Sequence, residues 1–183
     1  MEKRKIKTYH LPQLQKLLAE EGIETEQVAG VMDALRLKKR SNIFRTSAFQ
    51  NGLFEVQDAG SQLISEFLDV QSGMRVIDAC AGAGGKSLHI ATQMKNKGKV
   101  ISMDIEEWKL MELKKRAKRQ QISSIETRLI EPKTIKRLQN SADRLLLDVP
   151  CSGLGVLRRN PDTKWKMNEA FIEQIKETQA EII

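Results

Sequence analysis

The first fifty residues carry a helical repeat of apolar positions that soon breaks down. Leucines recur at helical spacing between Leu11 and Leu18, Gly22 interrupts the pattern, and a second periodic stretch follows around residues 28–31. A polar and basic run, LRLKKRSN, then covers residues 35–42 and suits either a solvated loop or contacts with RNA phosphates. We expect residues 1–50 to form a small N-terminal segment of helical or mixed structure, with possible RNA contacts.

From residue 51 onward, short apolar runs alternate with stretches that have helical periodicity. The sequence predicts strands over residues 74–78, 99–104, 125–130 and 144–148, and helices over 57–68, 86–94, 106–120 and from 167 to the end. This alternation predicts an α/β fold with an open, mostly parallel sheet and helices on both faces. No closing strand follows the last helix, so we expect the sheet to be incomplete on its C-terminal side, with an exposed edge that favours self-association.

Two of the predicted helices have a distinct apolar face. In the helix over residues 57–68 this face carries Leu63, Ile64 and Phe67. In the last helix, the isoleucines at positions 172, 175 and 182 suit a buried face.

Three of the predicted strands end in an aspartate. These residues are Asp78, Asp104 and Asp148. Ligands of open parallel sheets bind beyond the C-terminal ends of the strands, so the three carboxylates indicate a ligand site at one edge of the sheet.

Composition narrows the class of protein. The 183 residues include 31 Lys and Arg against 24 Asp and Glu, a net charge of +7 that favours a polyanionic partner. The two cysteines, Cys80 and Cys151, have neither CxxC nor metal-ligand spacing, which predicts no disulfide framework and no metal site and suits a reducing cytoplasm. No apolar run reaches the length of a membrane span, so we expect a soluble protein.

A glycine-rich turn, DACAGAGGKS, occupies residues 78–87, between a predicted strand and a predicted helix. Its glycines allow a ligand to approach the backbone, and the helix N-terminus favours an anion. The spacing matches neither a P-loop nor a GxGxxG dinucleotide motif, and a tight turn without a ligand is the alternative. Asp104, about 20 residues further along, can accept hydrogen bonds from ribose hydroxyls or cap the next helix.

The segment DVPCS, residues 148–152, is the most specific local feature. Pro150 disfavours continuation of a strand and places Cys151 on a loop above the sheet edge, where it can act as a nucleophile or pack as a small apolar residue. Cys80 is expected to serve packing and to touch a ligand through its backbone at most.

A basic cluster follows this loop. It contains Arg158, Arg159 and Lys164, with Trp165 beside them. Arginine can pair with phosphate and an exposed indole can stack on a base, whereas a solvated loop with Trp165 turned into the core is the alternative.

These motifs together resemble the Sun/Fmu family of RNA (cytosine-5) methyltransferases. The resemblance runs from about Asp33 to the C-terminus and includes GLFEVQD at residues 52–58 with Ser61, the glycine-rich turn, Asp104, and DVPCSGLGVLRRNPDTKW at residues 148–165. It implies a Rossmann-like class I methyltransferase core over residues 51–183, S-adenosylmethionine as cofactor, and methyl transfer to cytosine C5 in RNA, with ribosomal RNA as the expected substrate.

The resemblance also implies roles for individual residues. It implies a cofactor site made of Asp78, Cys80, Ala81, Gly82, Gly84, Gly85, Lys86, Asp104, Glu131 and Asp148. Within this set Asp104 holds the ribose and Glu131 stands where the family has an adenine-side aspartate. Lys86, Asp148 and Cys151 are implied in catalysis, with Asp148 near the target cytosine. Arg158, Arg159 and Lys164 are the expected RNA contacts.

The sequence departs from the family pattern at three places. Gly82-Ala83 replaces the usual Ala-Pro, and Val149 replaces alanine. The family's second cysteine, which attacks the base from a Thr-Cys-Ser motif, has no counterpart here, and the counterpart of Cys151 assists product release. We therefore expect a truncated domain with weak or absent turnover.

Three alternatives remain at this point. Cys151 can substitute as the nucleophile, as the Pro-Cys cysteine does in DNA cytosine-5 enzymes. The chain can also be a non-catalytic RNA-binding module derived from such an enzyme. The third alternative is a methyltransferase that acts on a protein or small molecule, and the sequence motif at residues 148–165 argues against it.

Overall fold

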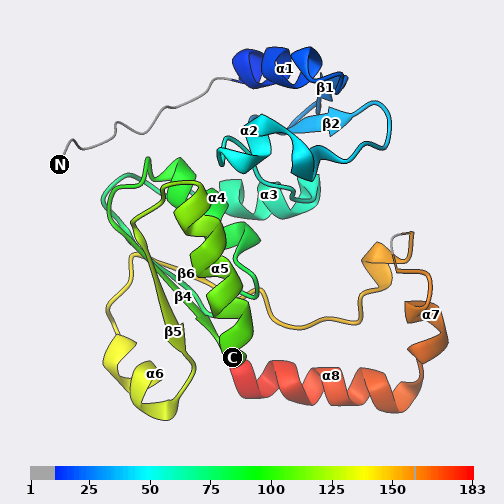
Figure 1. The fold of residues 1–183 in the computed structure, drawn as a ribbon. Helices are drawn as coiled ribbons and strands as arrows, with labels where there is room; N and C mark the ends of the chain where they lie inside the picture. The colour runs from blue at the N-terminus through cyan, green and yellow to red at the C-terminus, as the bar shows by residue number, and fades with distance from the viewer. Residues whose placement is uncertain (1–10, 159) are drawn as a thin grey trace.

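A four-stranded parallel sheet forms the centre of the fold. The computed structural model describes residues 11–158 and 160–183, and the strand order is β5-β4-β3-β6. The strands are β3 (Arg75–Asp78), β4 (Lys99–Asp104), β5 (Ile125–Leu129) and β6 (Arg144–Leu146). Their parallel pairing confirms the predicted α/β class (Figure 1).

Both faces of the central strands are covered, which explains their uninterrupted apolar sequences. On one face, Val76 and Val100 pack against Ile90 and Met94 of the helical layer. This layer contains α4 (Gly85–Gln93), with Met94 directly after it, and α5 (Glu107–Arg119). On the other face, Ile77 and Ile101 pack against Leu138 of α6 (Pro132–Leu138).

The N-terminal part contains a short helix, a two-stranded antiparallel sheet and two helical turns (Figure 1). It contains α1 (Leu11–Glu20), β1 (Thr25–Gln27), β2 (Leu35–Leu37), η1 (Ile43–Arg45) and α2 (Ser47–Gln50). Leu14, Leu18 and Ala48 form its buried cluster. The division into segments 1–50 and 51–183 remains a prediction.

Part of the basic run at residues 35–42 forms a strand, so a solvated loop, one of the two interpretations of this run, does not describe all of it. Residues 35–37 form β2, which pairs antiparallel with β1. Arg36 forms an ion pair with Glu26, and Lys38 forms one with Glu24, so two of its cations already have carboxylate partners.

The apolar faces of two helices differ from expectation. In α3 (Ala59–Phe67), Phe67 is 92% exposed, and Leu63 and Ile64 are also exposed, because α3 packs on α4 through its opposite side, where Ser65 is buried. The last helix, α8 (Glu169–Ile182), has no fully buried residue among those described. It follows η2 (Leu154–Val156) and α7 (Thr163–Lys166) and runs back from α7 toward the sheet in Figure 1.

Residues 11–158 and 160–183 contain neither a membrane-spanning helix nor a cluster of metal-ligating side chains. No helix there is both long and apolar enough to cross a membrane. The same part of the chain contains no group of three or more His, Cys, Asp or Glu side chains that could hold a metal ion.

Candidate functional site

The three aspartates predicted at strand ends lie at one edge of the sheet, although β6 ends at Leu146 and leaves Asp148 in the loop that follows, not in the strand predicted over residues 144–148. Asp78 is the last residue of β3 and pairs in register with Ser102 of β4, so Asp104 stands two residues beyond it on the neighbouring strand. On the other side of β3, Asp78 pairs with Leu146, and Asp148 follows two residues later. The parallel register therefore brings together the carboxylates predicted from the strand pattern.

The glycine-rich turn is fixed against β4 by its backbone. Gly82 and Gly84 have φ values of +54° and +85°, which side-chain-bearing residues rarely adopt. The Ala81 N–H donates to the Met103 carbonyl at 2.8 Å, and the Gly82 N–H donates to Asp104 Oδ2 at 2.9 Å. The turn thus lies directly beside the Asp104 carboxylate.

The Asp104 carboxylate contacts both the glycine-rich turn and the start of α5. Its Oδ1 accepts the Glu106 N–H at 2.9 Å, at the start of α5, while its Oδ2 accepts Gly82 N–H. Each carboxylate oxygen has two acceptor positions, so one on each oxygen is left for a further donor such as a ribose hydroxyl. The space above the turn is also open, since a Cβ placed on Gly82 or Gly85 would meet nothing within 4 Å.

Asp78 is held beneath the turn in a buried chain of hydroxyl groups. Ser102 Oγ donates to Ser87 Oγ at 2.7 Å, and Ser87 Oγ donates to Asp78 Oδ2 at 2.6 Å. Asp78 is only 1% exposed, and this burial raises the pKa of its carboxyl from 3.8 to about 6, with the Ser87 hydrogen bond opposing the shift and Asp148 adding to it. Asp78 therefore supports the turn from below.

Lys86 reaches from the first turn of α4 to the loop after β6. Its Nζ lies 2.5 Å from Asp148 Oδ2. Cys151 follows three residues later, exposed and outside regular secondary structure, as its position after Pro150 predicted. The Pro150 carbonyl accepts a hydrogen bond from Gln179 of α8 at 2.7 Å. Two of the three predicted catalytic residues are thus in direct contact.

Two other predicted site residues occupy different surroundings. Cys80 is half-buried, and burial, followed by the charges of Asp78 and Asp104, raises the pKa of its thiol and disfavours the thiolate. Glu131 is exposed at the start of α6 and lines a hollow of about 430 Å³ that it shares with Arg128 and Arg137. Glu131 follows β5, the strand next to β4.

The basic cluster after the Cys151 loop is exposed. Lys164 Nζ lies 4.5 Å from the centre of the Trp165 ring, and Trp165 is 79% exposed, so the indole is not turned into the core. Arg158 is also exposed. The prediction for Arg159 lies outside the described residues.

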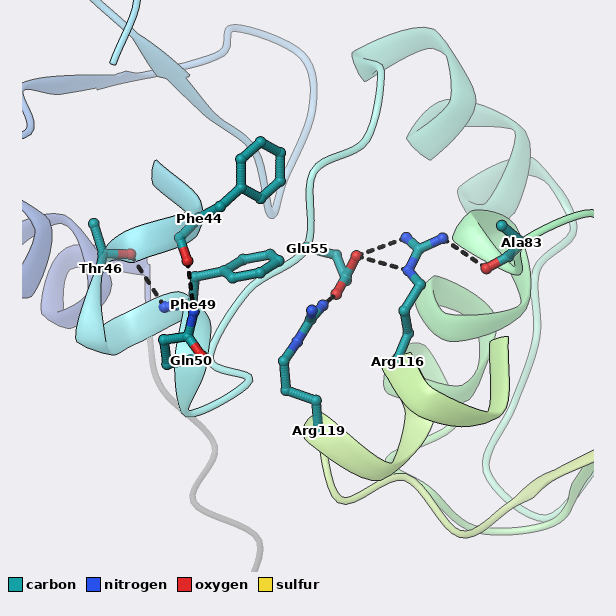
Figure 2. A network of polar contacts seen from close by, with 8 residues as sticks. All are labelled: Phe44, Thr46, Phe49, Gln50, Glu55, Ala83, Arg116 and Arg119. Carbon is teal, nitrogen blue, oxygen red and sulfur yellow. Dashed lines mark hydrogen bonds and ion pairs between the residues drawn. The ribbon is translucent and has the colours of Figure 1, made fainter. Parts of the chain in front are cut away.

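Sequence reasoning missed a set of residues beneath the glycine-rich turn. Arg116 of α5 donates from Nη1 to the Ala83 carbonyl at 2.6 Å, and from Nε and Nη2 to Glu55 Oε2 (Figure 2). Glu55 was visible only as part of the GLFEVQD string, and Arg116 only as one of several cations at the end of a helix. Nothing in their spacing, 61 residues apart, indicated a contact.

Comparison with known proteins identifies the family. The family model described as 16S rRNA methyltransferase RsmB/F matches residues 65–183. The chain belongs to this family. The predicted relationship to the Sun/Fmu methyltransferases and the Rossmann-like fold are thereby confirmed.

Relatives of known name agree with this assignment. The chain is 40% identical over 168 residues to the probable ribosomal RNA small subunit methyltransferase B of Bacillus subtilis, covering 91% of this chain and 37% of that protein. The ribosomal RNA small subunit methyltransferase B of Serratia proteamaculans is 36% identical and covers 91% of this chain, which spans 39% of its length.

Two solved structures are also similar. The crystal structure of PH0851 superposes with a TM-score of 0.89 and 31% identity, covering 96% of this chain and 40% of that one. NSun6 from Pyrococcus horikoshii, solved with SFG, has a TM-score of 0.65 and 28% identity, covering 79% of this chain and 37% of that one.

S-adenosylmethionine is the cofactor of RsmB/F-type methyltransferases, and the residues present here fit it. The open face over Gly82 and Gly85 leaves room for a ligand against the backbone, and Asp104 keeps acceptor positions for ribose hydroxyls. When bound, the cofactor supplies an activated methyl group.

Proposed function

We propose that this chain is part of an S-adenosylmethionine-dependent RNA (cytosine-5) methyltransferase that acts on small-subunit ribosomal RNA. Its cofactor site consists of the glycine-rich turn and Asp104. The base site consists of Asp148 and Lys86, with Cys151 on the loop above them. A cytoplasmic location accords with such a substrate.

The contact between Lys86 and Asp148 is the observation that carries this proposal. It joins the cofactor turn to the DVPC loop, so that groups implied in binding the methyl donor and the base share one edge of the sheet. A protein that only binds RNA has no need of such a junction. The RsmB/F relatives named as ribosomal RNA small subunit methyltransferases supply the substrate class.

The proposed chemistry assigns separate tasks to these side chains. Carbon 5 of cytosine is a poor nucleophile until a thiolate adds to carbon 6. Asp148 hydrogen-bonds the activated base, and Lys86 orients the Asp148 carboxylate through their ion pair. After methyl transfer the C5 proton leaves and the thiolate is eliminated, a step that Cys151 assists.

Cys80 and Cys151 are the two thiols in the chain that could attack carbon 6. The 183 residues contain two cysteines, and Cys80 is half-buried with a raised thiol pKa. Cys151, exposed beside Asp148, is the better placed of the two, but the family assigns it to product release. We therefore expect these 183 residues to bind the cofactor and to turn over weakly or not at all.

Calorimetric titration of the chain with S-adenosylmethionine tests the cofactor site. We expect saturable binding that is lost in Asp104→Ala. Asp143→Ala is the matched control, because Asp143 also accepts a backbone N–H, from Arg75 at 2.7 Å, but at the opposite end of the strands. Asp143→Ala should therefore retain binding.

A second titration, with single-stranded RNA, separates the proposal from its rival. A folded chain that binds RNA but not S-adenosylmethionine would support the non-catalytic RNA-binding module. Equal loss of cofactor binding in Asp104→Ala and Asp143→Ala would place the effect in general stability and remove support for the site.

We further propose that the outer edge of β6 mediates self-association. Leu145 is 54% exposed and Leu147 is 38% exposed, and among the described strands β6 pairs only with β3. An exposed strand edge with apolar side chains is a template for pairing with a second chain.

A further inference from the structure

The helix α5 supports the cofactor turn from beneath at two neighbouring residues. A Cβ on Gly84 would lie 2.1 Å from Leu113 Cδ1, so the turn backbone rests directly on this fully buried leucine. Arg116, three residues later and therefore on the same face of the helix, donates to the Ala83 carbonyl at 2.6 Å. The helix thus makes one apolar and one polar contact with the turn.

The guanidinium of Arg116 is itself fixed by a carboxylate from outside the helix. Glu55 Oε2 accepts from Arg116 Nε at 3.0 Å and from Nη2 at 2.6 Å, a forked arrangement that sets the plane of the guanidinium (Figure 2). The Arg116 and Glu55 side chains are both largely buried, at 16% and 15% exposure, so solvent screens the pair little. Glu55 therefore determines where the remaining donor, Nη1, points.

We propose that Arg116, oriented by Glu55, is a positioning residue that fixes the cofactor turn through the Ala83 carbonyl. It touches neither the proposed cofactor nor the reacting atoms. Its role is to hold the backbone between Gly82 and Gly84 in the conformation that leaves the ligand-facing side open. This inference rests on the proposed function, because it assigns the turn to S-adenosylmethionine.

The neighbouring Arg119 provides a matched control within the same network. It also forms an ion pair with Glu55, and its guanidinium lies 3.9 Å from the centre of the Phe49 ring. A Cβ on Gly52 would lie 2.2 Å from the Arg119 carbonyl oxygen, so this end of α5 packs closely against the segment before Glu55. Arg119 therefore shares the Glu55 partner, but its described contacts lie with the N-terminal part.

The experiment compares Arg116→Met with Arg119→Met in the 183-residue chain by two measurements. Amide hydrogen exchange of the ligand-free protein follows the peptide that covers residues 80–88. We expect several-fold faster exchange in Arg116→Met and little change in Arg119→Met. Calorimetric titration with S-adenosylmethionine should show affinity about tenfold weaker in Arg116→Met, as for loss of one charge-assisted hydrogen bond, and within twofold of wild type in Arg119→Met.

The two measurements distinguish failure of the proposed function from failure of the inference about Arg116. If the unmodified chain does not bind S-adenosylmethionine, the proposed function fails, and the exchange rates still decide whether Arg116 fixes the turn. Unchanged exchange in Arg116→Met, or equal changes in both variants, would overturn the inference. Arg116→Lys replaces Arg116→Met if the latter does not fold, because lysine keeps the charge near Glu55 but lacks the fork that reaches both partners.

Discussion

The ammonium group of Lys86 lies 2.5 Å from Oδ2 of Asp148 and joins the first turn of α4 to the loop after β6. The two residues are 62 positions apart in the sequence. The charge of Lys86 also lowers the pKa of Asp78, while the charge of Asp148 raises it. One cation therefore compensates two acidic groups at the edge of the sheet.

Replacing Lys86 with methionine should raise the pKa of Asp78 further. The substitution removes the positive charge that lowers this pKa and leaves the repulsion from Asp148 in place. Titration of the Asp78 carboxyl carbon by NMR measures the change. Lys109→Met is the control, since Lys109 pairs with Glu106 and Asp104, and an unchanged Asp78 pKa in Lys86→Met would contradict the prediction.

Asp78→Asn should remove a pH dependence of stability. The folded protein holds the Asp78 proton up to about pH 6, whereas the unfolded chain releases it near pH 3.8. The folded state thus binds more protons between these values, and the free energy of unfolding falls as pH rises through this range. Relative to the variant, the wild type should lose about 2 kcal/mol between pH 4 and pH 7 in urea unfolding. If the free energies of unfolding of the wild type and the variant changed with pH in parallel, the raised pKa of Asp78 would be contradicted.

Two glycine substitutions in the cofactor turn should have different consequences. Gly84→Ala combines a left-handed φ with a collision against Leu113 and should lower the free energy of unfolding by about 2–4 kcal/mol. Gly82→Ala adds its methyl group to open space and should lower it by about 1 kcal/mol, while weakening S-adenosylmethionine binding. Urea unfolding and calorimetry together distinguish the two. Equal stability of both variants would show that Leu113 does not support the turn.

Trp165→Ala should weaken binding of single-stranded RNA. Base stacking on an aromatic side chain contributes about 1–3 kcal/mol, so the dissociation constant should rise by about 5- to 100-fold. Fluorescence anisotropy with a labelled oligonucleotide measures it. Trp108→Ala is the control, since Trp108 is 62% exposed and belongs to α5, not to the segment that carries the basic cluster, and an equal effect of both variants would argue for non-specific contact.

Leu145→Lys should reduce self-association of the chain. A charge on β6 opposes pairing of its edge with a second copy. Light scattering over a range of concentrations should show a mass above that of the monomer for the wild type and a smaller mass for the variant. Met111→Lys alters a similarly exposed apolar residue, 52% exposed on α5, and should have no effect. A monomeric wild type at all concentrations would refute the prediction.

The sequence alone predicted the four strands of the sheet, the helices α3, α4, α5 and α8, and the carboxylates that follow the strands, but it did not predict the short helix α6. Apolar runs that end in Asp78 and Asp104 predicted β3 and β4, because a strand covered on both faces needs an uninterrupted apolar sequence. The glycine-rich turn was also predictable from the sequence, because the positive φ values of Gly82 and Gly84 are a local backbone conformation that glycine adopts readily.

Only the tertiary structure decided which side chains meet. The β1–β2 pairing was missed, because three-residue strands have too few positions for a periodic pattern. The exposure of Phe67 on α3 was also missed, since periodicity identifies an apolar face without saying what covers it. The Lys86–Asp148 and Arg116–Ala83 contacts depend on strand order and on the packing of α5 under the turn, both set by long-range burial. Local sequence determines elements and reactive groups, whereas burial over the whole sheet determines which of those groups act together.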